Sequence, residues 1–144
     1  MSESGVSQSG ASKSNEPRPG TVRKLKDVRI DKPWGYELRF AITERYLGKV
    51  IHINQGEALS LQYHEQKDET LLMTVGVMDL ELAGEDGVMQ THRLSVGDCV
   101  RIVPGRTHRM VAVEACEFFE VSSPEINDVI RLEDRYGREG SSAG

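Results

Sequence analysis

The sequence predicts an all-β fold, and three observations support this. Apolar and polar residues alternate through most of the body of the chain, which is the period of a strand with one buried face. Glycine, proline and asparagine interrupt these runs at intervals of about ten residues, as in sandwiches and barrels. Helical periodicity is scarce. With 144 residues, of which 38% are hydrophobic, the chain suits one small domain.

The two ends of the chain have a different composition from its body. Residues 1–25 are rich in serine, glycine, lysine and proline and carry few apolar side chains. Such a segment cannot offset the entropy of being ordered, so we expect a disordered tail. Residues 140–144 are similar and predict a flexible C-terminus. The single domain is therefore expected to span residues 26–139.

Four strands are expected in the first half of the body, at 36–40, 50–54, 58–64 and 69–75. Each is an alternating or apolar run that ends at a turn signal. Asn54-Gln55-Gly56 separates the second strand from the third, and Gly76 ends the fourth. Glycine supplies the positive φ that such turns require.

Five further strands are expected at 77–83, 88–94, 99–103, 108–114 and 116–122. The segment 84–87, Gly-Glu-Asp-Gly, joins the first two of these as a hairpin turn would. Pro104-Gly105 ends the third, because proline cannot donate to a ladder. The segment 126–136 is charged on most faces and predicts either one short helix or a strand followed by a helical turn.

Composition argues against several classes of function. No run approaches the roughly 20 apolar residues of a spanning helix, and the N-terminus lacks the apolar part of a signal peptide. We therefore expect a cytoplasmic protein with no membrane partner. The net charge is −5 and no basic tract is present, which argues against a nucleic-acid partner. Cys99 and Cys116 lie in alternating apolar stretches and are expected to be buried thiols.

A polar face in the expected strand 58–64 suggests a metal site. Ser60, Gln62 and His64 share that face by the period of two. Glu69 opens the next strand, and His108 follows the turn at Pro104-Gly105. Two imidazoles, one carboxylate and one amide oxygen suit Zn, Mn, Fe, Co or Ni. Judged by residue type alone, two structural histidines and a surface carboxylate explain the pattern equally well.

The spacing of these residues along the chain favours a metal site over structural histidines. The run Gly56-x5-Gln62-x-His64-x4-Glu69-x6-Gly76 resembles the first cupin motif, with glutamine where many members carry a histidine. The run Gly97-x6-Pro104-Gly105-x2-His108 resembles the second, with a shortened Pro-Gly spacing. The resemblance implies a double-stranded β-helix, or jelly-roll barrel, with a divalent metal near its centre. It nominates four ligands: Gln62, His64, Glu69 and His108.

A narrower resemblance covers nearly the whole body. Four segments are similar to the type II mannose-6-phosphate isomerase domain, which also forms the C-terminal part of bifunctional mannose-1-phosphate guanylyltransferases. They are Lys-Pro-Trp-Gly-Tyr-Glu at 32–37, Leu-Ser-Leu-Gln-Tyr-His at 59–64, His108-Arg109, and Asp-Val-Ile-Arg-Leu-Glu-Asp-Arg-Tyr-Gly-Arg at 128–138. The resemblance implies a stand-alone, metal-dependent aldose–ketose isomerase for a small sugar or sugar phosphate. It gives no ground for nucleotidyl transfer, because the glycine-rich nucleotide loop is absent.

Departures around the metal carboxylate leave the substrate open. Lys67, Asp68, Thr70 and Leu71 flank Glu69 where the family usually has arginine, alanine, histidine and tryptophan. Lysine keeps the positive charge but lacks the bidentate fork of arginine. Two other readings of the site therefore stand beside the isomerase. One is an Fe(II)-dependent dioxygenase built on two histidines and one carboxylate, and the other is a non-catalytic module that binds a metal or a sugar.

Candidate roles can be given to four further residues. Glu120 is the candidate general base, on the strand that also carries Phe118 and Ser122. Lys67, Arg109 and Arg131 are candidates for binding a phosphate, and Lys67 and Arg131 also for catalysis. A solvated surface charge explains each cation equally well. Because a small barrel exposes strand edges, we also expect a homodimer.

Overall fold

The structure is a computed structural model that describes residues 18–141. The described chain forms one 3-10 helix, η3 (Leu25–Val28), and otherwise only strands. The strands are β1 (Arg29–Lys32), β2 (Gly35–Ile42), β3 (Leu47–Ile53), β4 (Leu61–Tyr63), β5 (Glu69–Val75), β6 (Met78–Ala83), β7 (Met89–Leu94), β8 (Cys99–Ile102), β9 (His108–Ala112), β10 (Cys116–Ser122), β11 (Ile130–Glu133) and β12 (Gly140–Ser141). Between residues 18 and 141 no helix is long and apolar enough to cross a membrane.

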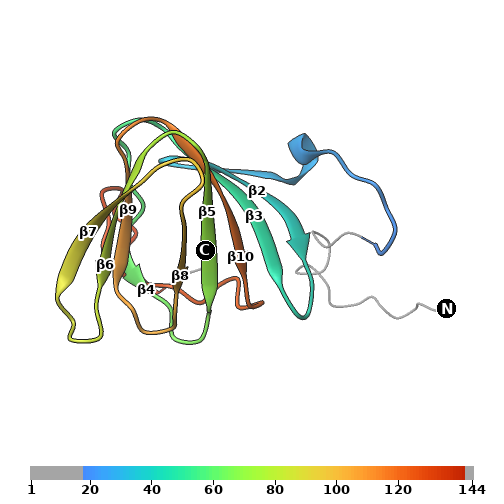
Figure 1. Cartoon of the computed structure of the whole chain (residues 1–144). Helices are drawn as coiled ribbons and strands as arrows, with labels where there is room; N and C mark the ends of the chain where they lie inside the picture. The colour runs from blue at the N-terminus through green and yellow to red at the C-terminus, as the bar shows by residue number, and fades with distance from the viewer. Residues whose placement is uncertain (1–17, 142–144) are drawn as a thin grey trace.

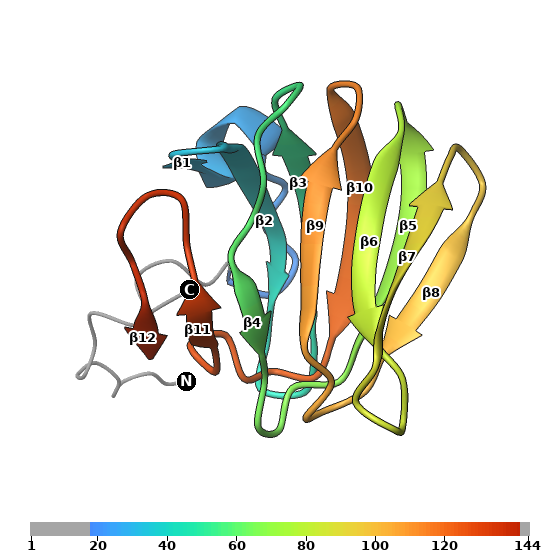
Figure 2. The ribbon, with the colours of Figure 1, turned by 90° about the vertical axis from the view of Figure 1, so that its left-hand side faces the viewer.

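The strands form two antiparallel sheets of six that face each other as the layers of a jelly roll (Figures 1 and 2). The first sheet has the order β1-β2-β3-β10-β5-β8, and the second has the order β12-β11-β4-β9-β6-β7. Strands distant in sequence pair inside each sheet, such as β3 with β10 and β4 with β11. The predicted double-stranded β-helix is confirmed.

Each of the nine expected strands is present, with ends shifted by a few residues. The largest difference is at 58–64, where only Leu61–Tyr63 forms a strand and Ala58 makes an isolated bridge to Val111. Of the two alternatives for 126–136, the strand followed by a turn is confirmed as β11. Of the predicted tail, residues 1–17 lie outside the described residues. At the other end, Gly140 and Ser141 pair with β11.

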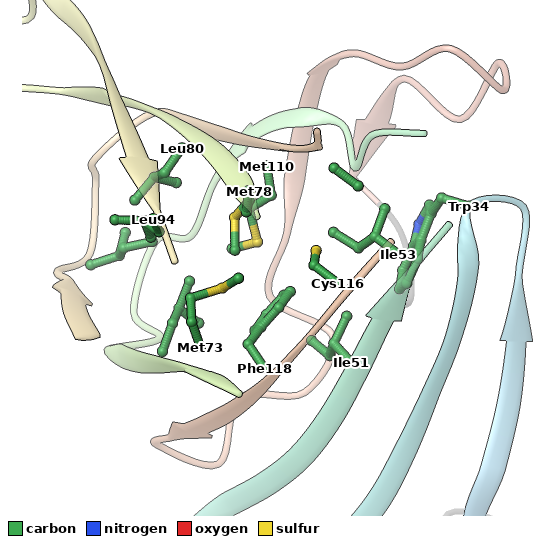
Figure 3. Close-up of a cluster of buried hydrophobic side chains, with 13 residues drawn as sticks. Trp34, Ile51, Ile53, Met73, Met78, Leu80, Leu94, Met110, Cys116 and Phe118 are labelled. Carbon is green, nitrogen blue, oxygen red and sulfur yellow. The ribbon is translucent and has the colours of Figure 1, made fainter. Parts of the chain in front are cut away.

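An apolar core fills one part of the space between the sheets. Met73, Met78 and Phe118 point toward one another there, with Leu80 beside them (Figure 3). Trp34 is 2% exposed and packs at the margin of this core, as a packing residue would. The remaining space between the sheets is lined by polar side chains and forms the candidate site.

The two cysteines have different environments. Cys116 is buried in the core, as expected, and burial raises the pKa of its thiol to about 11. The prediction that Cys99 is buried is wrong, because its side chain is exposed on β8. Strand β8 is the last strand of its sheet, and the side chain opposite in the ladder, Leu72, is also exposed.

Candidate functional site

A polar pocket lies between the two sheets, beside the apolar core. It encloses about 560 Å³ of empty space, counting its open mouth. Its apolar lining includes Trp34, Ile51 and Met110. Its charged and polar lining consists of Lys32, Glu37, Lys49, Ser60, Gln62, His64, Lys67, Glu69, His108, Glu120, Asp128, Arg131 and Arg138. So dense a set of buried charges is unusual, since charges are seldom buried unless they are paired or bind a ligand.

Three of the four predicted metal ligands converge in this pocket. His64 Nε2 lies 3.0 Å from Glu69 Oε2, and His108 Nε2 lies 3.4 Å from the same oxygen. One ligand atom from each residue can be chosen so that all three lie within 4.8 Å of one another. The side chains come from the loop after β4, the first residue of β5 and the first residue of β9. All three are buried.

Hydrogen bonds on the far side of each ring fix which nitrogen faces the site. His64 Nδ1 donates to the carbonyl oxygen of Asp128 at 2.5 Å, and His108 Nδ1 donates to the carbonyl oxygen of Arg106 at 2.9 Å. A carbonyl oxygen can only accept, so each Nδ1 carries the proton. In the neutral rings, both Nε2 atoms then present a lone pair to the Glu69 carboxylate.

This arrangement fits a divalent cation. Burial raises the pKa of Glu69, but the imidazoles of His108 and His64 and the ammonium of Lys67 outweigh burial and hold the pKa well below its usual range. The Glu69 carboxylate is therefore ionised when a proton or a cation lies between it and the two Nε2 atoms, and a divalent cation can take the place of those protons. His108 Nε2 is buried and makes no hydrogen bond. Metal-binding histidines typically donate their other ring N–H to a carbonyl or carboxylate oxygen, as the Nδ1 atoms of His64 and His108 do here.

Gln62, the fourth predicted ligand, lies beside the three. Its Cα is the register partner of His108 between β4 and β9, and the side chain lines the pocket. The structure thus brings Gln62 to the edge of the group. Coordination through its amide oxygen stays a prediction.

A row of alternating charges crosses the first sheet and ends at Glu69. We call the three converging residues, His64, Glu69 and His108, the metal group. Lys67 Nζ lies 2.6 Å from Glu120 Oε2 and 3.8 Å from Glu69 Oε1. Glu120 is the register partner of Lys49, and Lys49 Nζ lies 3.3 Å from Glu37 Oε1. Burial lowers the pKa of Lys67, but the carboxylates of Glu120 and Glu69 outweigh burial and raise the pKa above its ordinary value. Lys67 is therefore a buried ammonium between two carboxylates.

The structure separates the predicted phosphate-binding residues. Arg131 is 7% exposed, lines the pocket and has Gln62 as its register partner. Arg109 follows His108 in β9, so its side chain points to the opposite face of the sheet. There Arg109 Nη2 donates to Glu81 at 3.0 Å, and Nη1 donates to Glu133 at 3.5 Å. Arg109 is not part of the pocket lining.

Sequence reasoning did not identify the role of Asp128. Its carboxylate accepts hydrogen bonds from the backbone N–H groups of Glu65, Gln66 and Lys67 at 2.9, 2.7 and 2.9 Å. Burial raises the pKa of Asp128, but these three donors outweigh it and lower the pKa below its ordinary value. Asp128 is the first residue of the motif at 128–138, so the sequence did single it out. The spacing of the motif gave no indication that the Asp128 side chain would contact the loop at 65–67.

Comparison with known proteins agrees with the fold and with the motifs. Among solved structures, KdgF from Halomonas sp. superposes with a TM-score of 0.59 at 23% identity, over 67% of this chain and 87% of that one. Oxalate decarboxylase from Bacillus subtilis superposes with a TM-score of 0.66 at 21% identity, over 82% of this chain and 34% of the decarboxylase chain. An uncharacterised double-stranded β-helix protein from Klebsiella pneumoniae superposes with a TM-score of 0.64 at 15% identity, over 90% of this chain and the whole of the Klebsiella chain.

The sequence relatives give a second, independent comparison. The mannose-1-phosphate guanylyltransferase ManC of Salmonella typhimurium is 31% identical over 114 residues, which is 76% of this chain and 23% of ManC. The chain has the cupin fold. The xanthan biosynthesis protein XanB of Xanthomonas campestris is 29% identical to this chain over 115 residues, or 76% of this chain and 24% of XanB. No family model matches the sequence. The cupin spans about a quarter of the length of these relatives.

Proposed function

We propose that this cupin is a metal-dependent aldose–ketose isomerase that interconverts mannose 6-phosphate and fructose 6-phosphate. One observation carries the proposal: two imidazole lone pairs and the Glu69 carboxylate converge beside the buried ion pair of Lys67 and Glu120. The similarity to a mannose-1-phosphate guanylyltransferase supports a mannose phosphate as the substrate class.

The metal is assigned to the converging group. His64, Glu69 and His108 would hold the ion, with Gln62 as a fourth ligand. Nitrogen and oxygen donors of this kind suit Zn, Mn, Fe, Co or Ni. A divalent ion bound there supplies Lewis-acid stabilisation of the negative charge that develops on the two substrate oxygens.

The chain's own residues then move the proton. The Glu120 carboxylate takes the proton from C2 of the aldose and returns it to C1, while the hydroxyl proton passes from O2 to O1. No oxidant, reductant or other reagent is consumed. Lys67 fixes the position of the Glu120 side chain through the 2.6 Å contact. Because Glu120 is buried among the pocket side chains, bulk water is kept from the carbanionic centre.

The test combines metal analysis with turnover. The protein is stripped, reloaded with Zn, Mn, Co or Ni and incubated with mannose 6-phosphate in D2O. We expect fructose 6-phosphate to form, with deuterium entering at C1 or C2 only to the extent that the proton held by Glu120 exchanges with solvent before it is returned. Glu120→Gln should lower kcat at least 100-fold with unchanged metal content. Glu114→Gln, at an exposed position just beyond β9, is the matched control. Absence of interconversion with every metal would refute the proposal.

A second function is favoured by the ligand set itself. Two histidines and one carboxylate also support oxygen chemistry when the metal is Fe(II). Oxygen uptake by the Fe(II)-loaded protein, without isomerisation, would favour a dioxygenase. Stoichiometric metal with neither activity would favour a module that binds a metal or sugar without turning it over.

We also propose that the protein is a homodimer. The outer face of the first sheet exposes Phe40, Leu72, Phe119 and Val121, and the rings of Phe40 and Phe119 meet edge to face at 6.2 Å. An apolar face of this kind favours self-association through a two-fold axis. Light scattering checks this, and a mass equal to the 16.1 kDa of one chain would contradict it.

A further inference from the structure

We propose that Lys32, Arg131 and Arg138 form an anion-binding subsite at the side of the pocket away from the metal group, and that this subsite holds the phosphate of the substrate. The inference rests on the proposed function for the identity of the substrate. The subsite itself rests on the arrangement of charges in the pocket. It includes Arg131 from the sequence prediction and replaces Lys67 and Arg109.

Two of the three cations lie on strands and the third lies just before a strand, at the same side of the barrel. Lys32 ends β1, Arg131 lies on β11, and Arg138 lies just before β12. These strands lie together at one side of the molecule, whereas β9, which carries His108, lies nearer its centre (Figure 2). All three side chains line the pocket, and Arg131 is buried.

The spacing suits a substrate held at both ends. Arg131 is the register partner of Gln62, and Gln62 is the register partner of His108. Two strand spacings therefore separate the backbone of Arg131 from that of His108, a distance of about 10 Å. Long arginine and lysine side chains reach inward across part of that distance. A short sugar chain could have its carbonyl end at the metal group and its phosphate at the subsite.

Positive charge predominates at this side of the pocket. The Glu37 carboxylate is surrounded by Lys49, Lys32 and Arg39, which together hold its pKa near about 2 although burial opposes this. Lys32, Lys49, Arg131 and Arg138 line the pocket together with Glu37, and Arg138 pairs with Asp134 at 3.0 Å. A low-dielectric cleft with an excess of one sign of charge attracts a ligand of the other sign.

These cations lower one another's pKa values. Burial lowers the pKa of Lys32, and Arg39, Lys49 and Arg138 add to this effect while Glu37 opposes it. Bringing an anion among them would relieve the repulsion.

Asp134 prepares Arg138 for this role. Its carboxylate accepts hydrogen bonds from Nε and Nη2 of Arg138 at 3.0 and 3.1 Å, and from the Arg138 backbone N–H at 2.7 Å. The turn that returns Arg138 to the pocket uses Gly137 at a φ of 79°. A guanidinium held in one orientation binds phosphate with less loss of side-chain entropy, and its planar fork matches two phosphate oxygens.

The test measures binding without turnover. Inorganic phosphate is titrated into metal-loaded and metal-stripped protein and followed by calorimetry and 31P NMR. We expect binding to persist without metal, and Arg138→Gln to raise the Kd at least 10-fold. Arg131→Lys keeps the charge and removes the fork, so a smaller rise is expected. Arg93→Gln is the matched control, because Arg93 pairs with Asp79 on an exposed surface.

The outcomes separate this inference from the proposed function. Equal phosphate affinity in Arg138→Gln and the parent protein would overturn the subsite, even if isomerisation is observed. Weakened phosphate binding with no isomerisation would support the subsite and refute the proposed function. When turnover is present, Arg138→Gln should raise KM for mannose 6-phosphate and leave KM for unphosphorylated mannose unchanged. If Arg131→Lys does not fold, Arg138→Gln, with a side chain 25% exposed, carries the test.

Discussion

Asp128 binds His64 through its carbonyl oxygen, which accepts the Nδ1 proton of the imidazole at 2.5 Å. The carboxylate of the same residue accepts three backbone N–H groups from residues 65–67, the loop that follows His64. The segment before β11 therefore positions both a candidate metal ligand and the loop leading to Glu69. The terminal motif is thus part of the candidate metal site.

Asp128→Ala should weaken the metal site and the fold together. Three backbone donors lose their acceptor, although two of them lie at exposed residues that water can reach. We expect the free energy of unfolding to fall by about 1–2 kcal/mol in urea titration. Loss of such an outer partner typically weakens metal affinity by about 10–100-fold. Asp128→Asn keeps one acceptor oxygen and should be intermediate, so identical Ala and Asn variants would contradict this account.

His108→Ala should abolish metal binding without changing the fold. The Nε2 atom of His108 lies 3.4 Å from Glu69 and makes no hydrogen bond, so alanine removes one ring hydrogen bond, from Nδ1 to the carbonyl oxygen of Arg106, and leaves the backbone pairing of β9 in place. We expect elemental analysis to fall from about one ion per chain to a small fraction, with an unchanged circular dichroism spectrum. His92→Ala, on the exposed strand β7, is the control. Unchanged metal content in His108→Ala would refute the ligand assignment.

Lys67 and Glu120 should show strong coupling in a double-mutant cycle. Lys67→Met leaves the buried carboxylate of Glu120 without its partner at 2.6 Å, which typically costs about 3–5 kcal/mol. The double variant with Glu120→Gln removes both charges and should recover part of that loss. Urea unfolding of the four proteins measures the coupling. Additive effects would mean that the pair does not act as a unit.

The same pair shows where sequence reasoning succeeds and where it fails. The resemblance to the two cupin motifs nominated His64, Glu69 and His108 as ligands, and the structure brings these three side chains together. Alternation also put Glu120 on the inner face. Spacing could not show that Lys67 pairs with Glu120, because that contact depends on the pairing of β10 with β5. Spacing also could not show that Arg131 points into the pocket and Arg109 points away from it, because the face on which each side chain lies depends on strand register.

The two thiols should react at different rates. Cys99 is exposed, whereas Cys116 is buried and its pKa is raised to about 11. The thiolate is the reactive species, so a disulfide reagent at pH 8 should label one thiol rapidly in the native protein and the second only after unfolding. Cys99→Ser should remove the rapid phase. Rapid labelling of two thiols in the native protein would contradict the burial of Cys116.

Glu37 should make stability depend on pH in the acid range. Burial raises its pKa, but Lys49, Lys32 and Arg39 outweigh burial and lower the pKa to about 2 in the folded protein. An unfolded glutamate titrates near about 4.3. Since the folded pKa is the lower one, the stabilisation is complete above about pH 4.3 and is lost as the pH falls toward 2; it is on the order of 3 kcal/mol. In urea unfolding between pH 7 and pH 3, the stability difference between the parent protein and Glu37→Gln should therefore shrink as the pH falls. Parallel curves would show that Glu37 is not held ionised by these cations.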